Sequence, residues 1–260
     1  MRAAGVLKRA GLVVALPAVL LVVWWFSSAG STSFYAPPLS KILGTFAETW
    51  TVERLRADVL PSLLRLAAGY AVAVLVGVAL GVLVGSIRTV RATLEPVLEF
   101  FRAIPPPVLV PIIMLFAGIE NTMKIVVIAA GCVWPILLNT VEGVRATDEV
   151  LSDTARSYGL TGPARLRHLV LPAASPQIAA GMRQALSIGI ILMVISEMFA
   201  ASNGLGFTIV QFQRTFAIPQ MWTGILLLGL LGFALSVLFR FVEMRALAWY
   251  HGLRQAQRSS

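Results

Sequence analysis

Few side chains in this sequence have the types and spacing that catalysis or metal binding requires. Its single cysteine, Cys132, excludes a disulfide framework or a cysteine-based metal cluster within one chain, and two histidines, His168 and His251, argue against a histidine-rich site. The motifs HExxH and GxSxG are absent. No lysine follows a glycine, so the phosphate-binding loop GxxxxGK[ST] is absent too. We expect no catalytic residue, metal or cofactor in this chain.

Polar residues inside apolar runs are the better candidates for a functional role. Glu197 lies deep in the run IILMVISEMFAAS, and Asn203 opens a turn signal, Asn203-Gly204-Leu205-Gly206, just after it. A charge at the bilayer centre costs about 2.5–3.5 kcal/mol and usually faces a protein interior or an aqueous path. We therefore take Glu197 and Asn203 as candidates to line a translocation path. The alternative is that Glu197 simply reaches the surface near the end of its span.

A second group of candidates lies in FFRAIPPPVLVP, which contains Arg102, Pro105 and Pro106. Consecutive prolines remove backbone donors and break a helix. A broken helix survives at membrane depth only where protein or a water-filled cavity satisfies the freed carbonyls. These prolines therefore either line a path or mark a boundary where a helix begins. Arg102, like Arg183, is compatible with an anionic solute but also with an ordinary cation at the inner border.

The composition places these residues in a membrane protein. Of the 260 residues, 58% are hydrophobic and 13% are charged, whereas soluble domains have about 25% charged residues. We predict an all-α polytopic membrane protein. The net charge of +9 fits either nucleic-acid binding or cations that flank spans on the cytoplasmic side. We favour the second interpretation and expect a lipid bilayer, not a nucleic acid, as the partner.

Six apolar segments approach the length of about 20 residues that crosses a bilayer. The segments are residues 11–26, 66–87, 97–119, 125–138, 176–200 and 221–241. The first could be a signal peptide, because Ser27, Ser28 and Ala29 offer a cleavage point. The pair Trp24-Trp25 is instead typical of an interfacial anchor, so we predict that this span is retained.

The distribution of cations predicts the orientation of these spans. With the N-terminus in the cytoplasm, thirteen Lys and Arg lie on the inside and five on the outside, with three uncounted near borders. We expect a first span with an external connecting segment (1–60), a core membrane domain (61–250) that contains a long cytoplasmic loop (141–175), and a cytoplasmic tail (251–260). The amphipathic part of the connecting segment is either a helix on the membrane face or a plain connecting helix.

A stripe of small residues marks the span at 66–87. The residues recur every four positions and comprise Gly69, Ala73, Gly77, Gly81 and Gly85. This spacing places them on one face of a helix. Small residues let helix backbones approach closely in lipid, so the stripe predicts helix packing within a bundle and not a ligand site.

The segment TARSYGLTGPARLRHLVLP, residues 154–172, is unusually polar for this chain and predicts two helices joined by a turn. Thr147 is expected to cap the first helix, with acidic residues in its first turn. Gly159 should end that helix with a positive φ. The second helix should start at Pro163 and stop at Pro172, because the residue before a proline avoids helical geometry.

The first of these two helices would carry a mostly apolar face. Its residues are Val150, Leu151, Thr154, Ala155 and Tyr158. A helix this short is not stable alone in water. Its apolar face therefore needs a partner, which is either the protein's own span ends or another subunit.

This segment resembles the EAA loop, EAA-x3-G-x9-I-x-LP, of the membrane subunits of binding-protein-dependent ABC importers. The spacing matches in full, although Asp153 stands for Glu, Thr154 for Ala and Leu169 for Ile. The aligned positions are Asp153, Thr154, Ala155, Gly159, Leu169, Leu171 and Pro172. The blocks FRAIPPPVLVPIIMLFAGIENTMKIVVI, NTVEGVRA and SEMFAASNGLGFTIV are similar to the nitrate/sulfonate/taurine subfamily, and the likeness covers residues 61–249.

The resemblance implies a type I ABC importer permease fold in the bacterial inner membrane. Its implied partners are a second copy of the chain, a cytoplasmic ATPase dimer that binds ATP and Mg, and an external solute-binding protein. The EAA loop would form a coupling helix seated in a groove of the ATPase. The residues that this assigns to coupling are Asp153, Ala155, Tyr158, Gly159, Leu169, Leu171 and Pro172.

The resemblance also implies a substrate class, namely a small anionic solute such as a sulfonate, taurine or nitrate. Alternatives are a pyrimidine vitamin precursor or an aromatic acid. A secondary transporter without an ATPase would more often show internal repeats, which are not found here. A membrane scaffold or lipid-handling protein would need no external binding protein.

Overall fold

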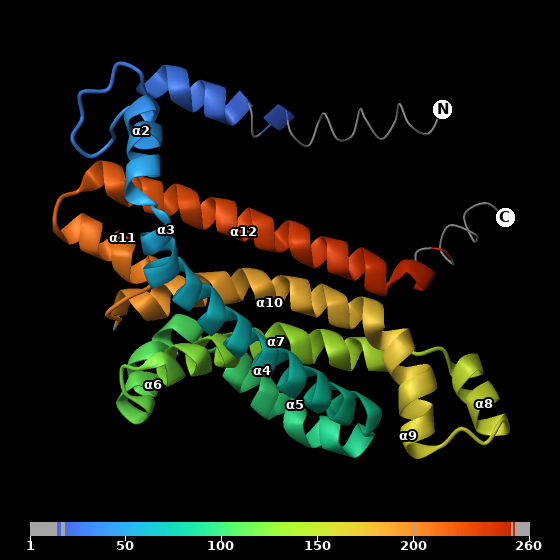
Figure 1. The fold of residues 1–260 in the computed structure, drawn as a ribbon. Coiled ribbons are helices and arrows are strands. Elements are labelled where there is room, and N and C mark those ends of the chain that lie inside the picture. The colour runs from blue at the N-terminus through green and yellow to red at the C-terminus, as the bar shows by residue number, and fades with distance from the viewer. Residues whose placement is uncertain (1–14, 17–18, 200, 251, 253–260) are drawn as a thin grey trace, which may run out of the picture.

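The computed structural model describes residues 15–16, 19–199, 201–250 and 252. Every regular element among these residues is helical, which confirms the all-α prediction. Figure 1 shows long helices lying alongside one another, with α2, α6 and α11 gathered at one end and α8 and α9 at the other. We call these the α11 end and the α8 end of the bundle.

Four helices of the described residues are long and apolar enough to cross a membrane. Two of them are single elements, and the other two are extended at their N-terminal ends by a short helix and a π turn. They are α4 (Leu60–Ser86), α7 (Asn121–Arg145), α10 (Leu171–Phe199) and α12 (Ile218–Ala246). A fifth candidate is the pair α5 (Arg88–Ala103) and α6 (Leu109–Ala117), bent by 76°. The predicted first span lies partly outside the described residues. Within the described part, Val19–Ser28 forms an apolar helix.

Short helices occupy the two ends of the bundle. At the α11 end these are α2 (Leu39–Thr49), α3 (Val52–Arg54), a π turn (Leu55–Val59), a 3-10 turn (Pro106–Val108) and α11 (Leu205–Arg214). At the α8 end these are α8 (Glu149–Ser157), α9 (Gly162–Arg165) and a second π turn (Leu166–Val170).

Helix α7 lies at the centre of the bundle, between α4 and α10. Its side chains dominate the largest buried cluster, together with residues from its two neighbours. Members include Met123, Ile128, Cys132 and Ile136 of α7, Leu66 and Ala73 of α4, and Ala185 and Leu192 of α10. Helix α7 extends beyond the predicted span 125–138 at both ends. Both extensions pack inside the protein, since Met123 and Val144 are buried.

The stripe of small residues on α4 is the surface that meets α7. A Cβ atom built on Gly81 would lie 2.5 Å from Cβ of Thr140, and one on Gly77 would lie 2.9 Å from Cβ of Ile136. Real Cβ atoms do not approach this closely, so only glycine permits the observed distance between the two helices. The predicted packing role of this stripe is confirmed.

The segment before α4 folds against the rest of the chain. Leu39 and Ile42 of α2 are buried, and the indole Nε1 of Trp50 donates to Oγ1 of Thr223 in α12 at 3.0 Å. Because α2 buries Leu39 and Ile42 within the protein, although Leu43 stays exposed, the structure favours the connecting-helix interpretation.

The predicted stop at Pro172 is wrong, since one helical segment runs from Gly162 to Phe199. A proline ring clashes with the carbonyl four residues earlier in a regular α-helix. Here that carbonyl belongs to His168, inside the π turn, where the amide of Leu171 donates to Leu166 O, five residues back. The wider turn accommodates the ring, and Leu171 keeps helical angles of φ −64 and ψ −44. Pro61 follows the other π turn in the same way.

Candidate functional site

The EAA-like segment builds a rigid helix at the α8 end. Oδ1 of Asp148 accepts from the amide of Val150 at 2.7 Å and caps α8. The predicted cap was wrong by one residue, since Thr147 lies before this position. A carboxylate is favoured there because it also meets the positive end of the helix dipole.

The other end of α8 is closed by Gly159. Its φ is +73, which confirms the predicted left-handed conformation. The amide of Gly159 donates to Arg156 O at 3.0 Å, and the amide of Leu160 donates to Ala155 O at 2.9 Å. This pair of hydrogen bonds is a Schellman motif. Both ends of α8 are therefore fixed by hydrogen bonds of this segment alone.

The apolar face of α8 is largely uncovered in the single chain. Val150, Leu151 and Tyr158 are 73%, 53% and 82% exposed, whereas Ala155 is buried. Arg165 of α9 donates to Oγ of Ser152 at 3.3 Å, which ties α8 to the following helix. This arrangement can present an apolar surface to another protein.

The structure divides the seven predicted coupling residues between two places. Four of them, Asp153, Ala155, Tyr158 and Gly159, lie on α8 and at its end, where all but Ala155 are exposed. Leu169, Leu171 and Pro172 are half-buried at the base of α10, where they hold the segment on the bundle. The coupling role of both groups stays a prediction.

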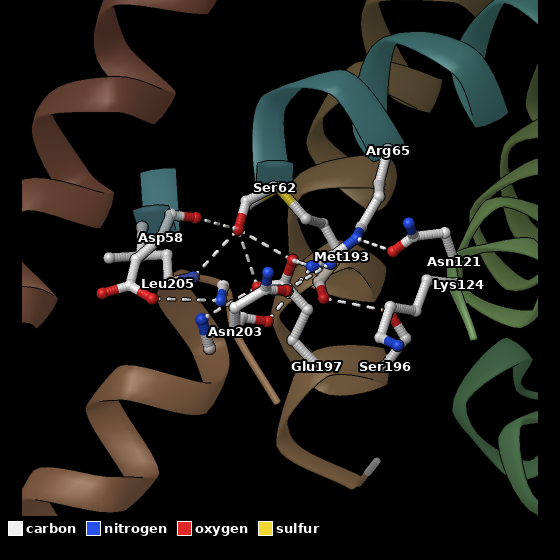
Figure 2. A network of polar contacts seen from close by, with 12 residues as sticks. Asp58, Ser62, Arg65, Asn121, Lys124, Met193, Ser196, Glu197, Asn203 and Leu205 are labelled. Atoms are coloured by element: carbon white, nitrogen blue, oxygen red, sulfur yellow. Dashed lines mark hydrogen bonds and ion pairs between the residues drawn. The ribbon is translucent and has the colours of Figure 1, made fainter. Parts of the chain in front are cut away.

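A second constellation, at the α11 end, is a buried network of polar side chains around Glu197 (Figure 2). Nη1 of Arg65 in α4 lies 2.8 Å from Oε1 of Glu197. Oγ of Ser62 lies 2.7 Å from the same oxygen, and the amide of Gly206 donates to Oε2 at 3.0 Å. Asn203 accepts from Nη2 of Arg65 at 2.5 Å. Glu197 thus has no exposed surface, and the alternative that it reaches the surface is wrong.

This network joins the neighbouring elements α10 and α11 to α4, whose Arg65 lies 132 positions before Glu197. Glu197 ends α10, Arg65 belongs to α4, and the amides of Leu205 and Gly206 begin α11. A carboxylate is stabilised at a helix N-terminus, so Glu197 holds the start of α11. A Cβ on Gly204 would lie 2.5 Å from the Glu197 carboxyl carbon, which explains the glycine in the predicted turn.

A cavity of about 330 Å³ adjoins the network. Its lining includes Arg65, Asn121, Lys124 and Asn203. Nε of Arg65 donates to Oδ1 of Asn121 at 2.8 Å, and Nζ of Lys124 donates to Ile119 O at 2.8 Å. The sequence reasoning missed Ser62, Arg65, Asn121 and Lys124. The signal that could have led to Arg65 is a cation next to an apolar run, because a buried carboxylate such as Glu197 needs a positively charged partner.

The other predicted path residues lie elsewhere. Pro106 reaches the middle of α7, since a Cβ on Gly131 would lie 3.1 Å from Cβ of Pro106. The proline break therefore packs against α7, and a helix also begins there, since the 3-10 turn Pro106–Val108 leads into α6. The path-lining role of these prolines stays a prediction. Arg102 is exposed and pairs with Glu99, while Arg183 pairs with Glu243 of α12. Glu197 and Asn203 are thus together, apart from Arg102, Pro105 and Pro106.

Residues 73–247 match the family model described as "Binding-protein-dependent transport system inner membrane component". The chain belongs to this family. It is therefore the permease subunit of an ABC importer, a transport component and not itself an enzyme. The long apolar helices and the short helix α8, which is capped at both ends, fit a membrane subunit of this kind.

Three curated relatives of the permease are similar over most of its length. A taurine transport system permease protein of Escherichia coli K12 is 31% identical, covering 90% of this chain and 87% of the relative. An aliphatic sulfonates transport permease protein, described as putative, of Bacillus subtilis 168 is 28% identical, with 90% and 86% covered. A nitrate import permease protein of Synechocystis sp. PCC 6803 is 29% identical, with 87% and 85% covered.

Solved structures share the fold of the permease. An inward-facing MetNI methionine ABC transporter aligns with a TM-score of 0.60 at 22% identity, covering 75% of this chain and 94% of that chain. An amino acid ABC transporter aligns with a TM-score of 0.53 at 17% identity, covering 82% and 96%. These likenesses show the ABC importer permease fold.

Proposed function

We propose that two copies of the permease form the membrane path for a small solute that carries an oxyanion group. The support is the set of relatives, which are named for taurine, aliphatic sulfonates and nitrate. A sulfonate and nitrate share a planar or trigonal array of negatively charged oxygens, so one kind of binding surface suits both.

In this proposal α8 is the coupling helix, and its uncovered apolar face binds a cytoplasmic ATPase. The observation that carries it is the exposure of Val150, Leu151 and Tyr158 on a helix whose two ends are fixed. Burying such a side chain contributes about 1.5–3 kcal/mol. ATP and Mg would be bound by the ATPase, since this sequence lacks a phosphate-binding loop.

The proposed mechanism is alternating access. A loaded binding protein docks at the α11 end, outside the cell, and ATP closes the ATPase pair at the α8 end in the cytoplasm. The segment from Gly162 to Phe199 is one continuous helical rod, so movement of α8 and α9 is carried directly into α10. Such coupling requires that each partner contacts the two states of the permease differently. Both termini are cytoplasmic in this arrangement.

Reconstitution tests this proposal. The permease, its ATPase and its binding protein are placed in proteoliposomes, and ATP-dependent uptake of taurine and of nitrate is measured. We expect uptake of at least one of the two anions, abolished when the ATPase is omitted. Uptake that persists without the ATPase would contradict the proposal and favour a secondary transporter.

A further inference from the structure

A polar patch lies on the pair of helices α7 and α10, which run side by side (Figure 1). It consists of Asn139 of α7 and Gln184 and Ser187 of α10. Gln184 and Ser187 are exposed in the single chain and Asn139 is half-buried. Spacings of three and seven residues place Gln184, Ser187 and Ile191 on one face of α10. Both helices are candidate membrane spans, and the three residues lie within them.

Contact with lipid would leave the polar groups of this face without hydrogen bonds. Hydrocarbon offers no hydrogen-bond partner, and each unsatisfied polar group there costs several kcal/mol. Polar residues inside spans almost always face the bundle interior or a water-filled cavity. The patch therefore faces water or another protein surface.

The hydrogen bonds within the patch fix the orientation of its two amides. Nδ2 of Asn139 donates to Pro135 O at 2.8 Å and to Oε1 of Gln184 at 3.2 Å. A backbone carbonyl can only accept, so the Asn139 nitrogen must face Pro135, and Gln184 must then present its oxygen. Within the described residues, Nε2 of Gln184 and the hydroxyl of Ser187 consequently have no protein partner. Two free donors remain on the exposed side.

Close packing of the two helices holds the patch in place. A Cβ atom on Gly181 would lie 2.6 Å from Pro135 O and 2.7 Å from Cβ of Asn139. Glycine at this position brings α10 against α7 one turn from Gln184. The Asn139–Gln184 pair is therefore anchored on the bundle and cannot swing freely on its surface.

We propose that Asn139, Gln184 and Ser187 line the translocation path. Nε2 of Gln184 and the Ser187 hydroxyl donate to the oxyanion group of the passing solute, and Asn139 is a positioning residue that orients Gln184. This inference rests on the proposed function for its substrate class. Neutral donors suit a path, because binding must be weak enough for the solute to leave.

Cysteine labelling in the assembled transporter tests the placement. On a Cys132→Ser background, which keeps a donor for Ala185 O, single Gln184→Cys and Ser187→Cys variants are assembled with the ATPase and binding protein in proteoliposomes. Reaction with a charged, water-soluble thiol reagent is then measured. The control is Phe233→Cys on α12, where an apolar side chain is 69% exposed.

We expect both α10 variants to react at least about tenfold faster than the Phe233→Cys control, because a thiol must ionise in water to react. Saturating taurine or nitrate should slow the reaction several-fold. Labelling as slow as that of the control would overturn the inference. Fast labelling that neither anion slows would instead contradict the proposed substrate class.

A transport measurement remains informative if a cysteine variant fails to fold. Ser187→Ala removes a hydroxyl that has no partner within the described residues, whereas Ser236→Ala on α12 removes one that bonds to Gly232 O within its own helix. We expect the KM for the transported anion to rise several-fold for Ser187→Ala and to stay unchanged for Ser236→Ala. Equal KM values in both variants would overturn the binding role.

Discussion

Gly159 is the single residue on which the geometry of α8 depends most. Its φ of +73 is open to glycine and disfavours β-branched side chains, while a built Cβ meets nothing within 4 Å. Gly159→Val therefore introduces backbone strain without a steric clash. We expect normal membrane insertion, weakened capture of the ATPase and loss of uptake, measured in proteoliposomes.

A conservative variant at the same position is the control. Gly159→Asn should retain most uptake, because asparagine tolerates the left-handed conformation. Full uptake by Gly159→Val would show that the Schellman end of α8 is not needed for coupling.

Glu197 and Arg65 give a prediction about stability. Glu197→Gln leaves a buried guanidinium without its carboxylate, and removing one partner of a buried pair costs about 3–5 kcal/mol. We expect a clear fall in the thermal unfolding temperature of the detergent-solubilised permease. Glu99→Gln is the control, because its pair with Arg102 is half-exposed and exposed pairs contribute about 0–1 kcal/mol. Equal shifts for the two variants would contradict the structural role of the network.

At the scale of elements, the contact between α4 and α7 is tested at Gly81. Gly81→Ala places a Cβ 2.5 Å from Cβ of Thr140, and overpacking of this kind costs about 1–3 kcal/mol. Gly229→Ala on α12 is the matched control, since nothing lies within 4 Å of its Cβ and alanine favours helix. We expect a lower unfolding temperature for Gly81→Ala alone. An unchanged temperature would mean that the two helices separate easily at this point.

Periodicity and local signals in the sequence were enough to predict most elements. Apolar length predicted the four long spans of the described residues, although the predicted count of six is not confirmed. The glycine at 159 predicted both the end of α8 and its positive φ. The continuous helix through Pro172 was missed, because a π turn depends on a shifted hydrogen bond that no residue type announces. The cap was displaced from Thr147 to Asp148, since both residues are good caps and only the geometry decides between them.

At the scale of the whole molecule, contacts between distant segments limited what the sequence could predict. Arg65 and Glu197 are 132 positions apart, so neither the ion pair nor the cavity beside it follows from local pattern. Glu197 was found as an outlier in an apolar run, but its partner was not. The polar patch of Asn139, Gln184 and Ser187 was missed for the same reason, since it forms only where α7 and α10 pack together.

Assembly decides whether these parts work as proposed, and the face of α8 is where assembly can be measured most directly. Tyr158→Ala removes an aromatic side chain that is 82% exposed in the single chain. If an ATPase covers it, about 1.5–3 kcal/mol of burial is lost, and every 1.4 kcal/mol lowers affinity about tenfold. Phe233→Ala, 69% exposed on α12, is the control.

The decisive measurement is the affinity of the ATPase for the purified permease in the wild type and in these two variants. We predict tight binding to the wild type and to Phe233→Ala, and binding at least about tenfold weaker to Tyr158→Ala. Equal affinity for all three proteins would contradict the central claim that the ATPase binds to α8.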